Sequence, residues 1–374
     1  MNLRRYEVDS IRSIALLLLI FYHIVISFFP ETKALIFIVN PDKADLGVGL
    51  LIVVSQALNI WRIPILFFIA GMAINFSSQR RNITEILKER SLRILVPLFF
   101  CSIFITPTYF YIHANYYNYD YSYWPAPAYL WFLNAIFYYS LLTLPIISIQ
   151  KTNPKIFVFF HNLLNNKFGM FFIFSIPMVI IATLGNPETY PNFVNFAAFP
   201  LLDVSINTNI HGFLVGLICF LIGFLFASSV EIFWNSVRSI KFITLAFAIA
   251  LFMQRLFLYL LPVWGGSPGA YPLVISNVLT AFESVCWMLS LVGFASSFLN
   301  KKNTILDYIT PAVFPVYIFH LPVQNFLASL IYPLSIVPIV KLIILTFSTI
   351  LVSVFLYEVV RRLKWFRVVF GMRP

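Results

Sequence analysis

The chain is dominated by apolar runs that are long enough to cross a lipid bilayer. The runs are roughly 17 to 25 residues long, and a helix of about 20 residues spans a hydrocarbon core of about 30 Å. Their density explains the composition, because 60% of the 374 residues are hydrophobic and 10% are charged. A typical soluble protein is about one quarter charged. The sequence therefore predicts a polytopic membrane protein.

Hydropathy predicts an all-α membrane bundle of about ten transmembrane helices. We expect a single domain over residues 1–374, with no separate soluble domain. The first run is not interpreted as a cleavable signal peptide, because it carries His23, lacks a small-residue cleavage pattern and is followed by further spans. Pro64, Pro145, Pro177 and Pro315 lie inside predicted helices, where we expect kinks. The predicted helices cover residues 10–29, 48–74, 94–113, 128–149, 168–185, 211–228, 241–262, 272–298, 311–331 and 336–358.

The basic residues predict the orientation. Of the 25 lysines and arginines, 20 lie near the two termini or in every second connection, and the opposite connections hold only Lys33 and Lys43. Such residues favour the cytoplasmic side, so both termini are expected there. The net charge of +11 then reflects topology and attraction to anionic membrane lipid. We expect no nucleic-acid partner.

Several ionisable residues lie at membrane depth, where they are costly and usually face the interior of a bundle or a wet cavity. A structural Glu–Arg pair is the alternative for the deep residues, and snorkelling is the alternative for arginines at the rim. Taken together, the residues predict a polar cavity. The deep residues are His23, Arg62, Arg255, Glu283 and His320, and the rim residues are Arg12, Arg90 and Arg93.

Arg12 and His23 share one stripe of the first predicted helix. Eleven residues at about 100° each bring the two side chains within about 20° of one another, with a rise of about 16 Å between them. A guanidinium stays charged and binds phosphate in a fork. An imidazole titrates near neutrality and can act as a general base on a hydroxyl. The stripe therefore suits an anion held at the cytoplasmic mouth and a base placed deeper.

Residues 109–131 are rich in aromatic side chains. They hold eight tyrosines and two tryptophans but no lysine or arginine. Such residues collect at membrane interfaces for amphipathic reasons, and they could also form a platform on which a sugar ring stacks. The three cysteines lie in apolar segments without metal-ligand spacing, so we expect structural thiols and no metal site.

Five segments resemble one known family, the membrane acyltransferases of the acyltransferase 3 type. They follow the family's order on a ten-helix plan, although Ala70-Gly71 stands where members often have Ser-Gly. The segments are "YEVDSIRSIALLLLIFYH" (6–23), "RIPILFFIAGMAI" (62–74), "ERSLRILVPLFF" (89–100), "WFLNAIFYY" (131–139) and "YIFHLPV" (317–323).

The resemblance implies a membrane O-acyltransferase. It would move a short acyl group, acetyl or succinyl, from cytoplasmic acyl-CoA to a hydroxyl of an extracytoplasmic or lipid-linked glycan, with no bound cofactor. A bacterial inner (plasma) membrane is the expected location.

The resemblance also suggests roles for individual residues. His23 is the candidate general base or acyl relay, and Arg12 binds or steers the donor. Arg90 and Arg93 add positive charge for the phosphates of the coenzyme. Glu283 could orient His23 or pair with Arg62 or Arg255. The candidate catalytic residues are His23, Arg12 and Glu283, and the candidate substrate-binding residues are Asp9, Arg62, Arg90, Arg93, Trp131 and His320.

Two other functions are compatible with buried charges in a helical bundle. A transporter, for example an exporter of lipid-linked glycan, often shows internal repeats and paired broken helices, and we find neither in the sequence. A membrane scaffold would not need an arginine–histidine stripe.

Overall fold

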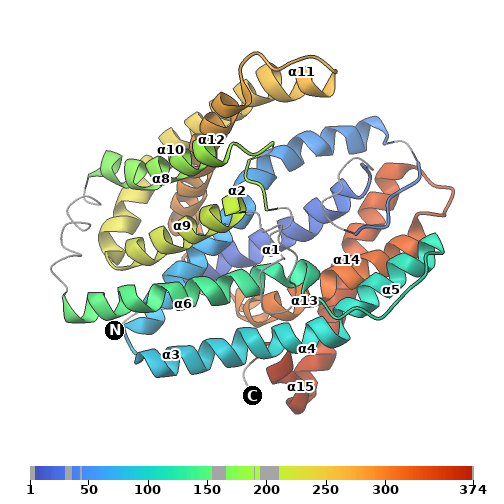
Figure 1. Ribbon diagram of the computed structural model, residues 1–374, viewed down its shortest axis with the longest axis horizontal. Coiled ribbons are helices and arrows are strands. Elements are labelled where there is room, and N and C mark those ends of the chain that lie inside the picture. Colours follow the sequence, from blue (N-terminus) through green and yellow to red (C-terminus); the bar gives the residue numbers. More distant parts are fainter. Residues whose placement is uncertain are drawn as a thin grey trace.

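The computed structural model describes residues 5–29, 36–42, 44–153, 166–188, 190–193 and 210–372. These residues form helices and connecting segments, without a β-strand among them (Figure 1). The α-helices are α1 (Tyr6–Ile26), α2 (Leu46–Ser78), α3 (Ile83–Arg90), α4 (Val96–Phe104), α5 (Thr106–Tyr117), α6 (Trp131–Thr152), α8 (Lys167–Gly185), α9 (Ile210–Ala227), α10 (Val230–Arg255), α11 (Leu261–Trp264), α12 (Leu273–Phe298), α13 (Thr304–Ile331), α14 (Pro338–Arg362) and α15 (Lys364–Val369).

The predicted all-α polytopic bundle is confirmed. In the described part of the chain, nine helical segments are long and apolar enough to cross a membrane, and Gly169–Gly185 is a shorter apolar helix. Two of the predicted spans are shorter than the helical segments in the structure. Residues 94–113 are part of a helical run over Ile83–Tyr117, and residues 241–262 are part of Glu231–Trp264. Charged side chains such as Arg90 and Arg238 lower hydropathy in the added turns, although helical hydrogen bonding continues through them.

The helix α1 lies in the middle of the bundle (Figure 1). It packs against α2, α12, α13 and α14. Buried residues occur around most of its circumference, including polar ones such as Ser10, Ser13 and His23. The part of the predicted stripe that carries His23 is therefore enclosed by other helices.

Glycines set the close approach of α2 and α9. A Cβ on Gly71 would lie 1.8 Å from the carbonyl oxygen of Phe220, and one on Gly223 would lie 1.9 Å from the carbonyl oxygen of Phe68. Neither position can hold a larger residue unless the helices separate. Small residues at such crossings are a common means of packing membrane helices.

An extended segment, residues 36–42, crosses the end of α1 that carries His23. Asn325 of α13 accepts from the backbone N–H of Ile38 (3.3 Å) and donates to the carbonyl of Ile36 (3.1 Å). The ammonium of Lys341, from α14, lies 2.5 Å from an oxygen of Asp42. Within this segment, the ring of Phe37 lies 5.7 Å from that of His23. These bonds fix one wall beside the histidine.

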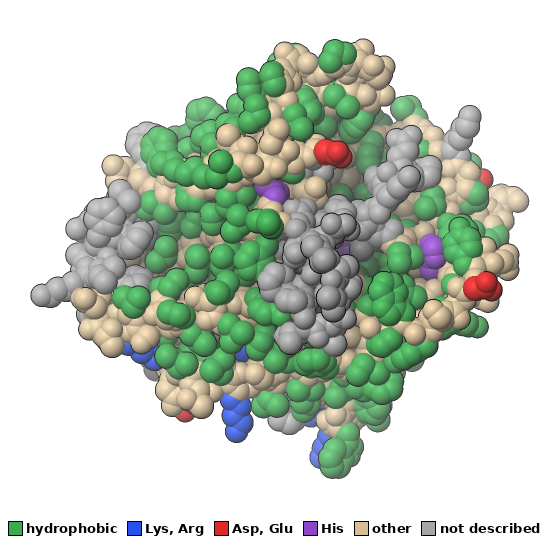
Figure 2. All heavy atoms as spheres, in the orientation of Figure 1, with side chains coloured by type: hydrophobic (Ala, Val, Ile, Leu, Met, Phe, Trp, Pro, Cys, Tyr) green, Lys and Arg blue, Asp and Glu red, His purple; other side chains and the backbone are tan. Residues whose placement is uncertain are grey.

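Basic side chains gather along one edge of the molecule. Figure 2 shows Lys and Arg side chains along the lower edge of the visible face, and the two chain ends marked in Figure 1 also lie in the lower part of that view. Hydrophobic side chains cover much of the remaining surface of this face. This surface fits a bundle embedded in lipid.

Candidate active site

The first helix carries Asp9, Arg12 and His23 as the sequence predicts. Arg12 Nη2 lies 3.0 Å from Asp9 Oδ1, in an ion pair across one turn. The Arg12 side chain is 39% exposed, whereas His23 is 9% exposed as a residue. The arginine therefore lies at an accessible end of the helix, and the histidine lies inside the bundle.

His23 is in contact with His320 of α13. His23 Nδ1 lies 3.2 Å from His320 Nε2, and the two rings stack with centroids 5.3 Å apart and an interplanar angle of 16°. His320 is fully buried. Two histidines that were predicted separately thus form one imidazole pair.

Hydrogen-bond partners assign the tautomers of this pair. The carbonyl of Tyr317 lies 2.6 Å from His320 Nδ1, and because a carbonyl only accepts, this nitrogen carries the proton. In a neutral ring His320 Nε2 then accepts, so His23 Nδ1 is the donor to it. The remaining nitrogen of a neutral His23, Nε2, keeps a lone pair. This is the nitrogen that can accept a proton or attack a carbonyl carbon.

A proline in α13 helps to fix the position of His320. Pro322 has no N–H, so the carbonyl of Ile318, four residues earlier, loses its helical donor. The hydroxyl of Tyr129 donates to that carbonyl at 2.7 Å, and the Tyr317 hydroxyl donates to the carbonyl of Tyr129 at 2.6 Å. The rings of Tyr129 and His320 are 6.1 Å apart. These two hydrogen bonds, one donated by each tyrosine, therefore hold α13 against the segment before α6.

Arg62 of α2 is a buried cation near the imidazole pair. It is 1% exposed, and its guanidinium carbon lies 3.8 Å from the ring centroid of Tyr22, the neighbour of His23. Its charge acts on both His23 and His320. Neither Nε nor Nη1 has a hydrogen-bond acceptor among the described residues. A buried guanidinium in this state favours the arrival of a negatively charged oxygen.

Of the three partners considered for Glu283, the structure shows Arg255. Arg255 Nε and Nη2 lie 2.6 and 3.1 Å from the two carboxylate oxygens, and the indole of Trp287 donates to one of them at 3.3 Å. Arg255 also donates to the carbonyl of Gln56. These bonds engage both carboxylate oxygens, so Glu283 is the partner of Arg255 on α10 and not of Arg62.

The predicted rim arginines form a basic cluster, with Arg12 near the start of α1, Arg90 at the end of α3 and Arg93 just after it. The charges of Arg12, Arg81 and Arg93 all act on Arg90, and Arg90 Nε is buried without an acceptor among the described residues. Glu89 pairs with Arg81 and, at 3.3 Å, with Arg93. One carboxylate is shared by two guanidiniums, which leaves the cluster with positive charge for an anionic ligand.

Trp131, at the start of α6, lies in a group of aromatic rings. Its ring stacks on Phe193 at 5.6 Å and 21°, and it lies 6.3 Å from Phe67. Its ring also lies 6.1 Å from that of Phe132. The preceding aromatic segment reaches the pair through Tyr129, while Tyr119 and Tyr123 are about 60% exposed (63% and 60%).

Sequence analysis missed the tyrosines that hold the pair. Tyr317 was part of a quoted motif but was given no role, and Tyr129 was counted only among the tyrosines of residues 109–131. Gln324, which donates to the backbone carbonyl of His23 at 3.2 Å, was also missed. Pro322 offered a signal, because a proline inside a helix leaves a carbonyl free at a known position.

Comparison with known proteins identifies the family. The profile of one protein family, described as an acyltransferase domain, matches residues 5–358, nearly the whole chain. No curated protein matches the chain, and no solved structure matches it. The match covers both histidines, the basic cluster and the helices that carry them. The chain therefore belongs to the acyltransferase 3 family and is a membrane acyltransferase.

Proposed function

We propose that this protein transfers a short acyl group, acetyl or succinyl, from cytoplasmic acyl-CoA to a hydroxyl of an extracytoplasmic or lipid-linked glycan. It would do so in a bacterial inner membrane. The observation that carries the proposal is the 3.2 Å contact between His23 Nδ1 and His320 Nε2. With Nδ1 of His23 donating to His320, Nε2 of His23 keeps a lone pair, which an acyltransferase can use as a base or a nucleophile.

The basic cluster is the proposed entry site for the donor. Coenzyme A carries several phosphate charges, and guanidinium groups bind phosphate in a bidentate manner. Arg12, Arg90 and Arg93 would hold these phosphates, and Asp9 would orient Arg12 through their 3.0 Å pair. His23 follows Arg12 by about 16 Å along the same helix. The thioester end of an extended donor would therefore reach toward the histidine while its phosphates stay at the cluster.

Two reaction routes use the same nitrogen. As a general base, His23 Nε2 takes the proton of the acceptor hydroxyl while its oxygen attacks the thioester carbonyl. The tetrahedral intermediate expels the thiolate of CoA, which receives the proton from the imidazolium. As a relay, Nε2 attacks the thioester carbonyl and expels the CoA thiolate, which leaves an acyl-imidazole. The acceptor hydroxyl then attacks this acyl carbon, the imidazole leaves, and the hydroxyl proton neutralises the thiolate. Both routes give CoA thiol and an ester.

Arg62 would stabilise the negative oxygen that forms on the thioester carbonyl in either route. Its buried Nε and Nη1 have no acceptor among the described residues, and a preorganised donor in a water-poor site is effective at a developing oxyanion. His320 would act as a positioning residue, since it fixes the tautomer of His23. Trp131 and the exposed tyrosines are the proposed contacts for the acceptor sugar.

Transfer can be tested on membrane vesicles that contain the full chain. Radiolabelled acetyl-CoA and succinyl-CoA are supplied on the cytoplasmic side, and label in glycan is measured together with released CoA thiol. We expect His23→Ala to abolish both signals at normal expression. His211→Ala, a histidine of α9 outside the pair, is the matched control and should retain them.

Full transfer by His23→Ala would overturn the mechanism. Glycan that crosses the membrane without acquiring label would favour a transporter. Comparing the glycans of a deletion strain and its parent by mass spectrometry identifies the acyl group and the acceptor together.

A further inference from the structure

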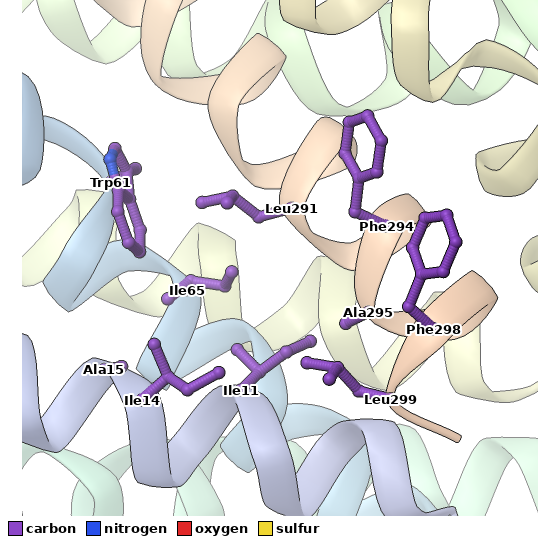
Figure 3. A pocket seen from close by; sticks show the side chains of 10 residues that line it. All are labelled: Ile11, Ile14, Ala15, Trp61, Ile65, Leu291, Phe294, Ala295, Phe298 and Leu299. Atoms are coloured by element: carbon purple, nitrogen blue, oxygen red, sulfur yellow. The ribbon is translucent and has the colours of Figure 1, made fainter. Parts of the chain in front are cut away.

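A groove lies between α1, α2 and α12, away from the imidazole pair. It has a volume of 280 Å³ and is lined by ten hydrophobic residues, including Ile11 and Ile14 of α1, Trp61 of α2, and Phe294 and Phe298 of α12 (Figure 3). An apolar cavity of about 150 Å³ already stays dry and binds benzene. The groove therefore has room for a longer hydrocarbon chain, and its hydrophobic lining disfavours bound water.

The rim of the groove is exposed on the side of α1 and α12. Ile14 is 44% exposed and Phe298 is 63% exposed. In a membrane bundle these side chains meet lipid tails, so the groove is open to a chain that enters from the bilayer.

A lysine lies at the α12 wall of the groove. The Lys241 ammonium lies 5.7 and 5.5 Å from the ring centroids of Phe294 and Phe298, and it donates to the hydroxyl of Ser297 at 2.7 Å. These partners are all neutral, and no carboxylate pairs with this lysine in the described part of the chain. The charge at the groove is therefore available to an anion.

The groove also ends beside further positive charge. Leu299, which lines it, follows the last residue of α12, and the exposed Lys301 and Lys302 lie two and three residues further along the chain. This connection is one of those that the basic-residue pattern places on the cytoplasmic side. An apolar slot that opens to lipid and ends at three lysines complements a molecule with a long alkyl chain and an anionic head.

We propose that the groove binds one acyl chain of an anionic glycerophospholipid from the cytoplasmic leaflet, with its phosphate beside Lys241. The alternative occupant is the acyl chain of a long-chain donor. The groove uses Ile11, Ile14 and Ala15 of α1, which lie roughly a third of a turn around the helix from Arg12 and His23. The lipid site is thus separate from the proposed donor path, and it does not depend on the proposed reaction.

Binding can be measured by native mass spectrometry of the full chain in mild detergent. Phosphatidylglycerol and phosphatidylcholine with identical acyl chains are titrated separately. We expect one phosphatidylglycerol to bind more tightly than phosphatidylcholine. Lys241→Gln should weaken phosphatidylglycerol by about five-fold, the equivalent of one surface lysine, and weaken phosphatidylcholine less, because the choline cation offsets the charge of its phosphate. Lys364→Gln, an exposed lysine of α15, is the charge control and should bind like the parent.

A second variant tests the groove itself. Ala295 lines it, and Ala295→Phe should lower the binding of both lipids by obstructing the chain. Ala250→Phe places the same ring at an exposed position of α10 and should change neither. Equal binding of the two lipids to the parent, or unchanged phosphatidylglycerol binding by Lys241→Gln, would overturn the proposal. Tighter binding of palmitoyl-CoA than of phosphatidylglycerol to the parent, lost in Ala295→Phe, would assign the groove to the donor and also overturn the proposal.

Discussion

His23 and His320 are 297 residues apart in sequence, yet their facing nitrogens are 3.2 Å apart. One ring comes from the first helix and the other from α13, and the carbonyl of Tyr317 sets the direction of the hydrogen bonds between them. His320→Ala removes the acceptor for His23 Nδ1. We expect turnover to fall by at least about ten-fold with little change in KM for acyl-CoA, because tautomer control acts on the chemical step.

The test is steady-state kinetics over a pH series. A positioning role predicts that the acidic limb of the kcat profile shifts in His320→Ala. An unchanged kcat and an unchanged profile would remove His320 from the site.

Arg62 is expected to increase turnover while lowering the stability of the fold. Arg62→Met removes a buried guanidinium whose Nε and Nη1 have no acceptor among the described residues, and the lost cation–π contact with Tyr22 is worth about 0.5–2 kcal/mol. Because a buried charge with unsatisfied donors costs more than this, we expect Tm in detergent at or above that of the parent. Turnover should fall about 10²- to 10³-fold, as for the loss of one oxyanion donor. A large drop in Tm with turnover per folded protein preserved would contradict the assignment.

The pair of Glu283 and Arg255 can be separated from catalysis by a double-mutant cycle. Glu283→Gln leaves the Arg255 charge buried, so we expect a loss of about 3–5 kcal/mol in the free energy of unfolding. Combining Glu283→Leu with Arg255→Met should recover most of that stability. If the double variant recovers acyl transfer, the pair has a structural role, which agrees with the contacts of Glu283 and Arg255. If the double variant is stable but inactive, Glu283 has a catalytic role.

The donor site predicts a specific effect of Arg12. Arg12→Ala should raise the apparent KM for acyl-CoA by about ten-fold, the equivalent of one charge-assisted hydrogen bond, and change the acceptor KM less. Arg361→Ala is a matched control, since Arg361 is 51% exposed and pairs with an acid three residues earlier, as Arg12 does. A larger effect on the acceptor KM would move Arg12 out of the donor site.

The close approach of α2 and α9 predicts that a glycine-to-alanine substitution has opposite effects on stability at two positions of α2. Gly71→Ala forces a methyl group against the Phe220 carbonyl, and we expect a loss of about 1–3 kcal/mol in the free energy of unfolding. Gly49, also in α2, has nothing within 4 Å of a built Cβ, so Gly49→Ala should gain about 0.5–1 kcal/mol from helix propensity. Thermal unfolding of both variants in detergent checks the pair. Equal shifts would show that the crossing tolerates a side chain.

Much of the fold could be predicted from the sequence because hydropathy acts locally. The apolar runs located the spans, and the stripe of Arg12 and His23 required only the helical repeat. The errors fell where charged turns extend a helix beyond its apolar core, as they do before residue 94 and before residue 241. The single-domain organisation and the orientation of the termini stay predictions.

The pairing of polar residues could not be predicted, since it depends on which helices become neighbours. Glu283 had three plausible partners, and the packing of α10 on α12 selects Arg255. The contact of His320 with His23 likewise required α13 to lie beside α1. Gly71 was noted only for its neighbour Ala70, although the structure gives it a packing role against α9.

The separation of the two histidines also bears on how the enzyme is made. A ribosome adds about 5–20 residues per second, so the 297 residues between His23 and His320 take roughly 15 to 60 s to synthesise. During that interval the first helix is already made while its imidazole partner does not yet exist. A nascent or truncated chain that ends before α13 therefore lacks the imidazole pair. On the proposed mechanism, acyl transfer requires the completion of nearly the whole polypeptide.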